Sequence, residues 1–157
     1  MPRTKRKRIG SIKTELVNKS REAAMAAVQI FNNPQISFKS ELFIVTMHIA
    51  WTYLLHAYYR NNKMDYRYFS QNGKRKRFDK TKHGAYKYWE LERCLNDKNS
   101  PLDKDTSNNL RFLITLRHEI EHQMTSHIDD TITAKFQACA LNYNSLCEPS
   151  VTVTHNY

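Results

Sequence analysis

The sequence has few residues that break helices, because its 157 residues include only three glycines and four prolines. The long stretches between them offer few places for a tight turn, so long helices are favoured over many short strands. A chain of this length is the size of one ordinary domain with a single core. We therefore expect one all-α domain.

Cysteine is also scarce: Cys94, Cys139 and Cys147 are odd in number and form no C-x-x-C pair. This pattern argues against a disulfide framework and a four-cysteine zinc site, and it favours a reducing compartment. The basic N-terminal residues are followed by Gly10 and polar residues instead of an apolar run, so no signal peptide is expected. We expect a cytoplasmic protein in which residues 1–14 form a basic, disordered arm.

Acidic residues are in the minority, since 15 Asp and Glu face 25 Lys and Arg, for a net charge of +10. Such a positive field attracts polyanions, either nucleic acid or an anionic membrane. Residues 42–59 lack charge and have the length of a membrane span. Because Thr46, His48, Thr52 and His56 would be costly in lipid, we interpret this segment as a buried central helix and expect no membrane partner.

Apolar residues at spacings of three and four predict helices, and stop signals bound them. The predicted helices cover about residues 15–31, a second from a cap at Ser37 or Ser40 to residue 62, then 86–96, 107–126, and 130–146 capped by Asp130. Asn72-Gly73, between aromatic and basic residues, predicts a small β-hairpin insertion. The helical domain is thus expected over residues 15–147, and residues 148–157 form an unassigned C-terminal tail.

The fourth predicted helix carries a dense group of ionisable residues, Arg117-His118-Glu119-Ile120-Glu121-His122. His118 and His122 share a face nearly opposite to the core face of this helix. The simplest interpretation is a solvated helix with two surface histidines. However, Ile114 lies on the histidine side, which suggests that this face meets another surface, and Arg, His and Glu together make a plausible catalytic set.

The same segment also matches the zinc-binding pattern H-E-x-x-H, in which two imidazoles bind the metal and Glu119 would act as the base. A catalytic zinc ion needs a third protein ligand, and the next histidine, His127, is one residue too early for the metzincin pattern. A zinc-dependent hydrolase is therefore the weaker interpretation. We expect no metal ion and no other cofactor.

Arg117 and His122 resemble the R-x4-H motif of the HEPN superfamily. Further segments resemble a bacterial HEPN-like domain of unknown function (DUF 3644 type): Lys19-Ser20-Arg21-Glu22-Ala23, Phe31-Asn32-Asn33-Pro34, Ala50-Trp51-Thr52, Leu55-His56-Ala57 and Trp89-Glu90-Leu91. The resemblance implies a HEPN-like bundle of about five helices. It also implies, as in many members, a metal-independent ribonuclease of a bacterial defence or toxin system.

In such an enzyme the 2′-hydroxyl of RNA attacks the adjacent phosphorus, so the protein need only transfer protons and stabilise charge. The resemblance assigns proton transfer to His122 and charge stabilisation to Arg117, while His118 adds a further titratable group. Arg117 and His122 diverge by about 140° around a helix. The resemblance therefore implies a homodimer in which two motif helices meet at a twofold axis.

Two further groups of residues are candidates. Supporting roles at the motif are expected for Glu121, Arg111, Ser20, Arg21 and Glu22, although a surface ion pair on the first helix is the plainer alternative for the last three. RNA binding is expected for Lys74, Arg75, Lys76, Arg77, Tyr66 and Tyr68, because cations neutralise phosphates and flat rings stack on unpaired bases. The alternative is a hairpin edge that its cations keep soluble.

The resemblance, together with the basic charge, implies a dimeric endoribonuclease, a defence or toxin effector that cleaves structured RNA such as tRNA. A neutralising or regulatory protein partner would then exist. The alternative from a different class is a non-catalytic nucleic-acid-binding or regulatory HEPN module, and the zinc hydrolase is the third hypothesis.

Overall fold

The computed structural model describes residues 11–121 and 130–151, which form five helices and one two-stranded sheet. The elements are α1 (Ile12–Phe31), α2 (Lys39–Asn61), β1 (Phe69–Asn72), β2 (Arg75–Phe78), α3 (Leu91–Leu95), α4 (Lys104–Glu121) and α5 (Asp130–Val151). The predicted helical chain with a small hairpin is thereby confirmed. No helix among these residues is both long and apolar enough to cross a membrane.

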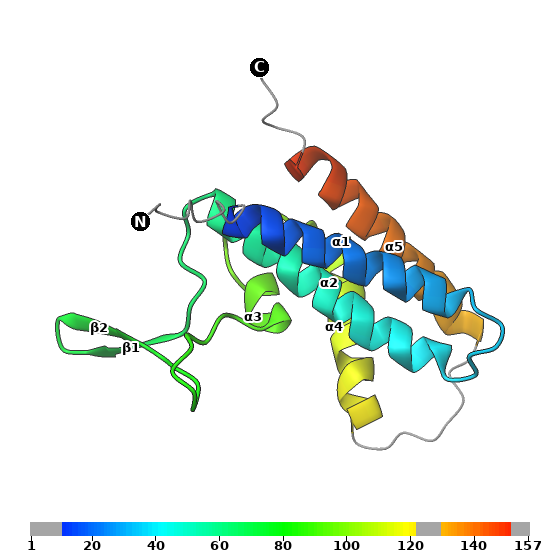
Figure 1. Cartoon of the computed structure of the whole chain (residues 1–157), viewed down its shortest axis with the longest axis horizontal. Coiled ribbons are helices and arrows are strands. Elements are labelled where there is room, and N and C mark those ends of the chain that lie inside the picture. The colour runs from blue at the N-terminus through cyan, green and yellow to red at the C-terminus, as the bar shows by residue number, and fades with distance from the viewer. Residues whose placement is uncertain (1–10, 122–129, 152–157) are drawn as a thin grey trace, which may run out of the picture.

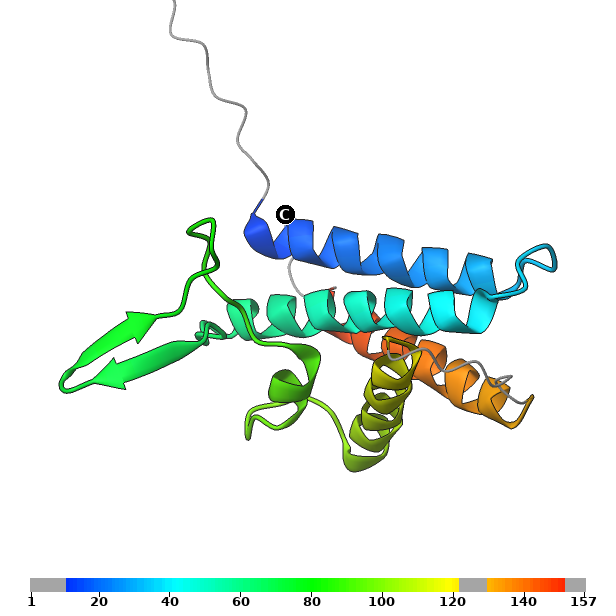
Figure 2. The same ribbon diagram turned by 90° about the horizontal axis from the view of Figure 1, so that it is seen from below.

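Helix α2 is the centre of the molecule. It lies antiparallel beside α1, and α4 and α5 cover its opposite side (Figures 1 and 2). Trp51, Leu55 and Tyr59 of α2 are completely buried. Burial of one such large apolar side chain is worth about 1.5–3 kcal/mol, so the uncharged segment supplies much of the stability of the fold.

Polar groups inside this buried helix have partners. Thr46 and Thr52 donate their hydroxyls to the carbonyls of Leu42 and His48, at 2.6 and 2.7 Å. The Trp51 indole donates to Cys139 Sγ of α5, at 3.3 Å. Because these polar groups find hydrogen-bond partners within the protein, their burial is tolerated.

An aromatic cluster joins the C-terminal end of α1 to the N-terminal parts of α2 and α5. The ring of Phe136 on α5 lies 5.0 Å from Phe43 and 5.7 Å from Phe31 between centroids. The Trp51 and Tyr143 rings meet edge to face at 5.5 Å. These contacts hold α5 against the α1–α2 pair over much of its described length.

Several predicted boundaries were wrong. Helix α1 begins at Ile12, three residues early, because the Ser11 hydroxyl accepts the Thr14 N–H and caps the helix. Helix α2 begins after Phe38, with no side-chain cap, so neither predicted serine caps it. Helix α4 begins at Lys104, where the Asp103 carboxylate accepts the Thr106 N–H. Helix α5 runs past the predicted end, to Val151.

Helix α3 is shorter than predicted because residues 86–90 are not helical. Tyr86 and Tyr88 instead form isolated antiparallel bridges with Lys80 and Arg67 at the base of the hairpin. The alternation of Tyr86 and Tyr88 is the period-two pattern of an extended segment. This segment carries the chain from the hairpin to Trp89, which is buried.

The hairpin projects from one end of the bundle (Figures 1 and 2). Asn72 pairs with Arg75, so the two-residue loop is Gly73-Lys74 and not the predicted Asn72-Gly73. Gly73 has φ +62°, and a positive φ at the first loop residue is the glycine position of a type II′ turn.

Candidate functional site

Arg117 lies in the last part of α4 and contacts the central helix. Its side chain is half-buried, and Nη1 is 3.3 Å from Nε2 of His48 on α2. A guanidinium group can only donate hydrogen bonds, so the His48 nitrogen must be the acceptor. The pair therefore requires a neutral His48 whose proton is on Nδ1.

A pocket of about 300 Å³ lies beside this pair. Residues of α2, α4 and the extended segment before α3 line it, among them His48, Thr52, His56, Tyr88, Glu90 and Arg117. The three α2 residues are spaced by four, which places them on one face of the helix. An arginine and two imidazoles thus meet at one surface depression.

His56 lines the pocket and is buried. Its Nε2 lies 2.7 Å from the Trp89 carbonyl oxygen, so this nitrogen carries the proton and donates. Burial lowers the pKa of His56, and the hydrogen bond to Trp89 opposes this only in part. His56 is consequently a neutral, fixed side chain at neutral pH.

The other motif residues lie at the end of α4. His118 and Glu119 are exposed, and the exposure of His118 agrees with the face predicted from the helical wheel. Helix α4 ends at Glu121, whose side chain, together with all of His122, lies outside the described residues. Ile114 is buried in the core of the same chain, so the surface that it meets belongs to this domain.

Arg111, predicted to support the motif, binds another part of the protein. Its Nη2 donates to the Asn96 side-chain oxygen at 2.6 Å, at the end of α3. The contact joins α4 to the residue that caps the C-terminal end of α3. Arg111 therefore fixes α4 relative to α3.

Ser20 and Arg21, also predicted to support the motif, instead join α1 to α5. Ser20 is fully buried and donates to the Ala50 carbonyl of α2 at 2.6 Å, so its second partner, the Tyr143 hydroxyl, donates to Ser20. Ala50 is two residues beyond His48, about 160° away around α2. Ser20 and Arg117 thus approach α2 from opposite sides, and Ser20 joins α1 to α2 and α5. Its role at the motif stays a prediction, because the side chain of Glu121 and all of His122 lie outside the described residues.

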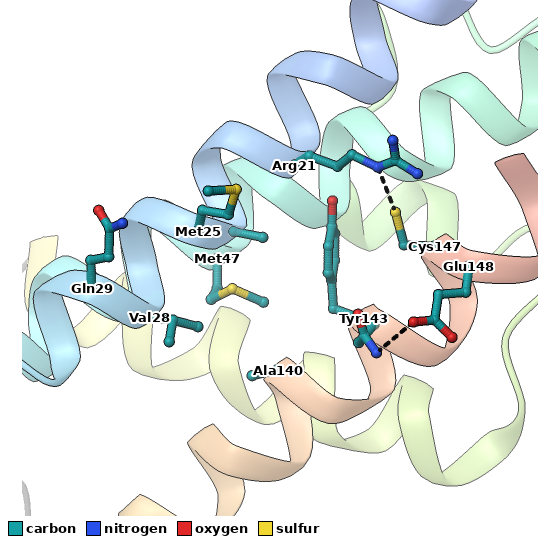
Figure 3. A pocket seen from close by; sticks show the side chains of 11 residues that line it. Arg21, Met25, Val28, Gln29, Met47, Ala140, Tyr143, Cys147 and Glu148 are labelled. Atoms are coloured by element: carbon teal, nitrogen blue, oxygen red, sulfur yellow. Dashed lines mark hydrogen bonds between the residues drawn. The ribbon is translucent and has the colours of Figure 1, made fainter.

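Arg21 lines a separate pocket between α1 and α5, of about 580 Å³, shown in Figure 3. Its Nε donates to Cys147 Sγ at 3.5 Å, and the pKa of Arg21 is raised mainly by this bond. Met25 and Met47 contribute apolar surface to the same pocket. Glu22, the third residue of this group, is exposed on α1.

The basic hairpin is solvated, as its composition predicts. The side chains of Lys74, Arg75, Lys76 and Arg77 are exposed. Lys76 Nζ lies 3.9 Å above the Phe69 ring, and Arg67 lies 3.8 Å above the Phe78 ring, so cations already cover these aromatic faces.

The two predicted stacking tyrosines differ from expectation. Tyr66 is buried, with its ring 4.7 Å from His56 and 5.0 Å from Tyr88, so it is not available to a base. Tyr68 is half-buried, and its hydroxyl accepts the Glu90 N–H at 3.4 Å. Tyr88, by contrast, is 43% exposed at the edge of the same cluster.

His48 and Tyr88 are the site residues that the sequence interpretation missed. His48 was assigned only as a polar residue unsuited to lipid, yet the spacing of His48, Thr52 and His56 by four marks a polar stripe on an otherwise apolar helix. Tyr88 was assigned to a helix, which hid its place beside Tyr66.

Comparison with known proteins gives one finding. The family model described as a domain of unknown function (DUF3644) matches residues 15–155. No curated protein and no solved structure shows a significant match. Because the matched residues cover nearly all of the sequence, the chain belongs to the DUF3644 family.

Proposed function

We propose that this protein is a HEPN-type endoribonuclease that cleaves RNA without a metal ion, using Arg117 and His122. One observation supports it above the others. Arg117, the residue that the motif assigns to the phosphate, contacts His48 beside a pocket that His56 also lines. A guanidinium fixed in this way is ready for the non-bridging oxygens of a phosphate group.

The proposed reaction is an internal transfer within the RNA. The 2′-oxygen forms a bond to the adjacent phosphorus as the P–O5′ bond breaks, leaving a 2′,3′-cyclic phosphate and a 5′-hydroxyl. His122 takes the 2′-hydroxyl proton or gives a proton to the departing 5′-oxygen, and a second imidazole completes the exchange. Arg117 stabilises the negative charge of the phosphorane.

The second imidazole comes, in this proposal, from another copy of the chain. Two α4 helices that meet at a twofold axis bring Arg117 and His122 of both copies to one cleft. His118, exposed beside Arg117, then lies near the same cleft as a further proton carrier or phosphate contact. Light scattering at micromolar protein should report a dimer, and a persistent monomer would remove the composite site.

The substrate in this proposal is structured RNA such as tRNA, and the chain acts as a cytoplasmic defence or toxin effector with a neutralising partner. The net charge of +10 supports an RNA substrate, and the exposed cations of residues 74–77 offer phosphate contacts away from the cleavage site. A non-catalytic RNA-binding module would share this charge. It would not need the Arg117–His48 arrangement.

The decisive experiment combines four variants with total tRNA and a chelator. Arg117→Ala and His122→Ala should each reduce cleavage about a hundredfold or more, the usual loss for an oxyanion donor or a proton-transfer group. Glu119→Ala, an exposed neighbour, is the matched control and should retain activity. His118→Ala tests the additional imidazole. End-group analysis should detect 5′-hydroxyl fragments.

Three results would count against the proposal. Full activity in Arg117→Ala and His122→Ala would exclude the motif as the catalytic site. Intact tRNA at high concentrations of the wild-type protein would favour the binding module. Activity that disappears with a chelator and in Glu119→Ala would instead indicate the zinc-dependent mechanism.

A further inference from the structure

The pocket beside Arg117 adjoins a second pocket, and Tyr88 lines both. The second pocket has a volume of about 390 Å³ and lies between the end of α2 and the base of the hairpin. Its lining includes three cations, Arg60, Lys63 and Arg67. A concentration of positive charge at a concave surface attracts a phosphate group.

The charges of this pocket do not cancel. Asp65 is the one carboxylate among its described lining residues, and it binds Arg67 through Oδ2 at 2.9 Å. Hydrogen bonds from Arg67 lower the pKa of Asp65, so the carboxylate of Asp65 and the guanidinium of Arg67 both remain charged and offset each other. Arg60 and Lys63 are both exposed, and the described residues give neither of them a carboxylate partner within salt-bridge distance. The pocket therefore keeps a net positive charge.

Tyr88 lines both pockets, and its ring packs against two other rings. It lies 5.0 Å from the buried Tyr66 ring at an interplanar angle of 35°, and 6.0 Å from the buried His56 ring. The Tyr88 side chain remains 43% exposed. An exposed ring fixed by two buried rings is a ready surface for stacking, because little conformational entropy is lost when a base binds.

We propose that Tyr88, Arg60 and Lys63 bind the nucleotide next to the one whose phosphate contacts Arg117. Its base stacks on Tyr88, and its phosphate enters the pocket of Arg60 and Lys63. A base can reach a protein ring only when it is unpaired, so the ligand is a single-stranded RNA segment, such as a loop, and not a duplex. This inference rests on the proposed nuclease function and names its substrate class.

Binding can be measured without cleavage by using a fluorescein-labelled 2′-O-methyl RNA 12-mer, which lacks the attacking hydroxyl. Fluorescence anisotropy should show that Tyr88→Leu weakens binding about tenfold, a typical loss for one stacked base. Tyr88→Phe, the matched control, keeps the ring and should bind within about twofold of wild type. The 12-mer annealed to its complement should bind more weakly than the single strand.

A second pair of variants tests the phosphate contact independently of the ring. Arg60→Gln with Lys63→Gln should weaken binding. The slope of log affinity against log salt concentration, which is negative, should become less steep by about 0.7 for each lost phosphate contact. Lys98→Gln with Lys104→Gln removes the same charge from exposed positions elsewhere and should leave the slope nearly unchanged. All four positions are exposed, so folding should survive in both variants.

The outcomes separate this site from the proposed chemistry. Wild-type affinity in both Tyr88→Leu and the Arg60 and Lys63 variant would overturn the inference, as would tighter binding to the duplex. Tyr88-dependent binding, together with intact total tRNA at high concentrations of the wild-type protein, would overturn the nuclease function and support the site. Cleavage of RNA with no dependence of binding on Tyr88 would support the nuclease function and overturn the inference about this site.

Discussion

Replacing Ser20 by alanine should lower the free energy of unfolding by about 2 kcal/mol and leave the RNA affinity of the folded protein unchanged. Ser20 is fully buried between three helices, where it donates to Ala50 of α2 and accepts from Tyr143 of α5. The change therefore removes a structural link between α1, α2 and α5. It does not reach Arg117, which contacts α2 from the other side.

The magnitude follows from what each substitution leaves behind. Ser20→Ala leaves the buried Tyr143 hydroxyl without its acceptor, which costs about 1–3 kcal/mol, partly offset by about 0.5 kcal/mol of helix propensity. Tyr143→Phe removes the donor instead, and Ser20 keeps its bond to Ala50, so the cost is about 1 kcal/mol. The double variant leaves neither hydroxyl and should cost at least 1 kcal/mol less than the sum of the two single changes.

The assay is urea denaturation followed by circular dichroism, with all three variants and the wild type. RNA affinity is then measured at a temperature at which every variant is folded. Additive losses of stability would show that the two hydroxyls do not interact. A loss of RNA affinity in Ser20→Ala as large as that in Arg117→Ala would instead support the predicted role of Ser20 at the motif.

Three further predictions concern other parts of the molecule. His48→Ala should slow single-turnover cleavage about tenfold by releasing Arg117, whereas His48→Gln keeps an acceptor and most activity; equal losses would make His48 a proton-transfer group instead. Burial lowers the pKa of His56, so protonation of this side chain favours the unfolded chain. Its contribution to stability is therefore present above about pH 6.5 and is lost as the pH falls. The melting temperature should drop towards pH 5, and His56→Gln should reduce that drop. Phe136→Ala should cost about 3–5 kcal/mol in urea denaturation, and a loss below about 1 kcal/mol would contradict its place in the aromatic cluster.

The helices could be predicted because their signals are local. The uncharged stretch of residues 42–59, the periodicity of α1 and α4 and the Asn72-Gly73 pair each act within one element. Boundaries were less accurate where competing signals overlap, as at Ser11, which caps α1 although it follows the basic N-terminal residues. The hairpin loop lies one residue later than predicted, because glycine suits the first position of a two-residue loop as well as the second.

The site was harder to predict because its contacts join distant parts of the chain. Arg117 was identified from its motif, but its partner His48 is 69 residues away and no local pattern connects the two. Tyr66 was expected to be exposed because it lies near basic residues. Its burial depends on packing against His56 and Tyr88, which only the folded chain brings together.

The central position of α2 also has a consequence for the order of folding. Helices α1 and α2 are neighbours in the sequence and pack more extensively than any other pair of helices, so they can associate early at low entropic cost. Phe43 and Trp51 of α2, however, are covered by Phe136 and Tyr143 of α5. During synthesis the α1–α2 pair exposes these two rings until α5 leaves the ribosome. We therefore expect the nascent chain to be most prone to aggregation in the interval before α5 is made.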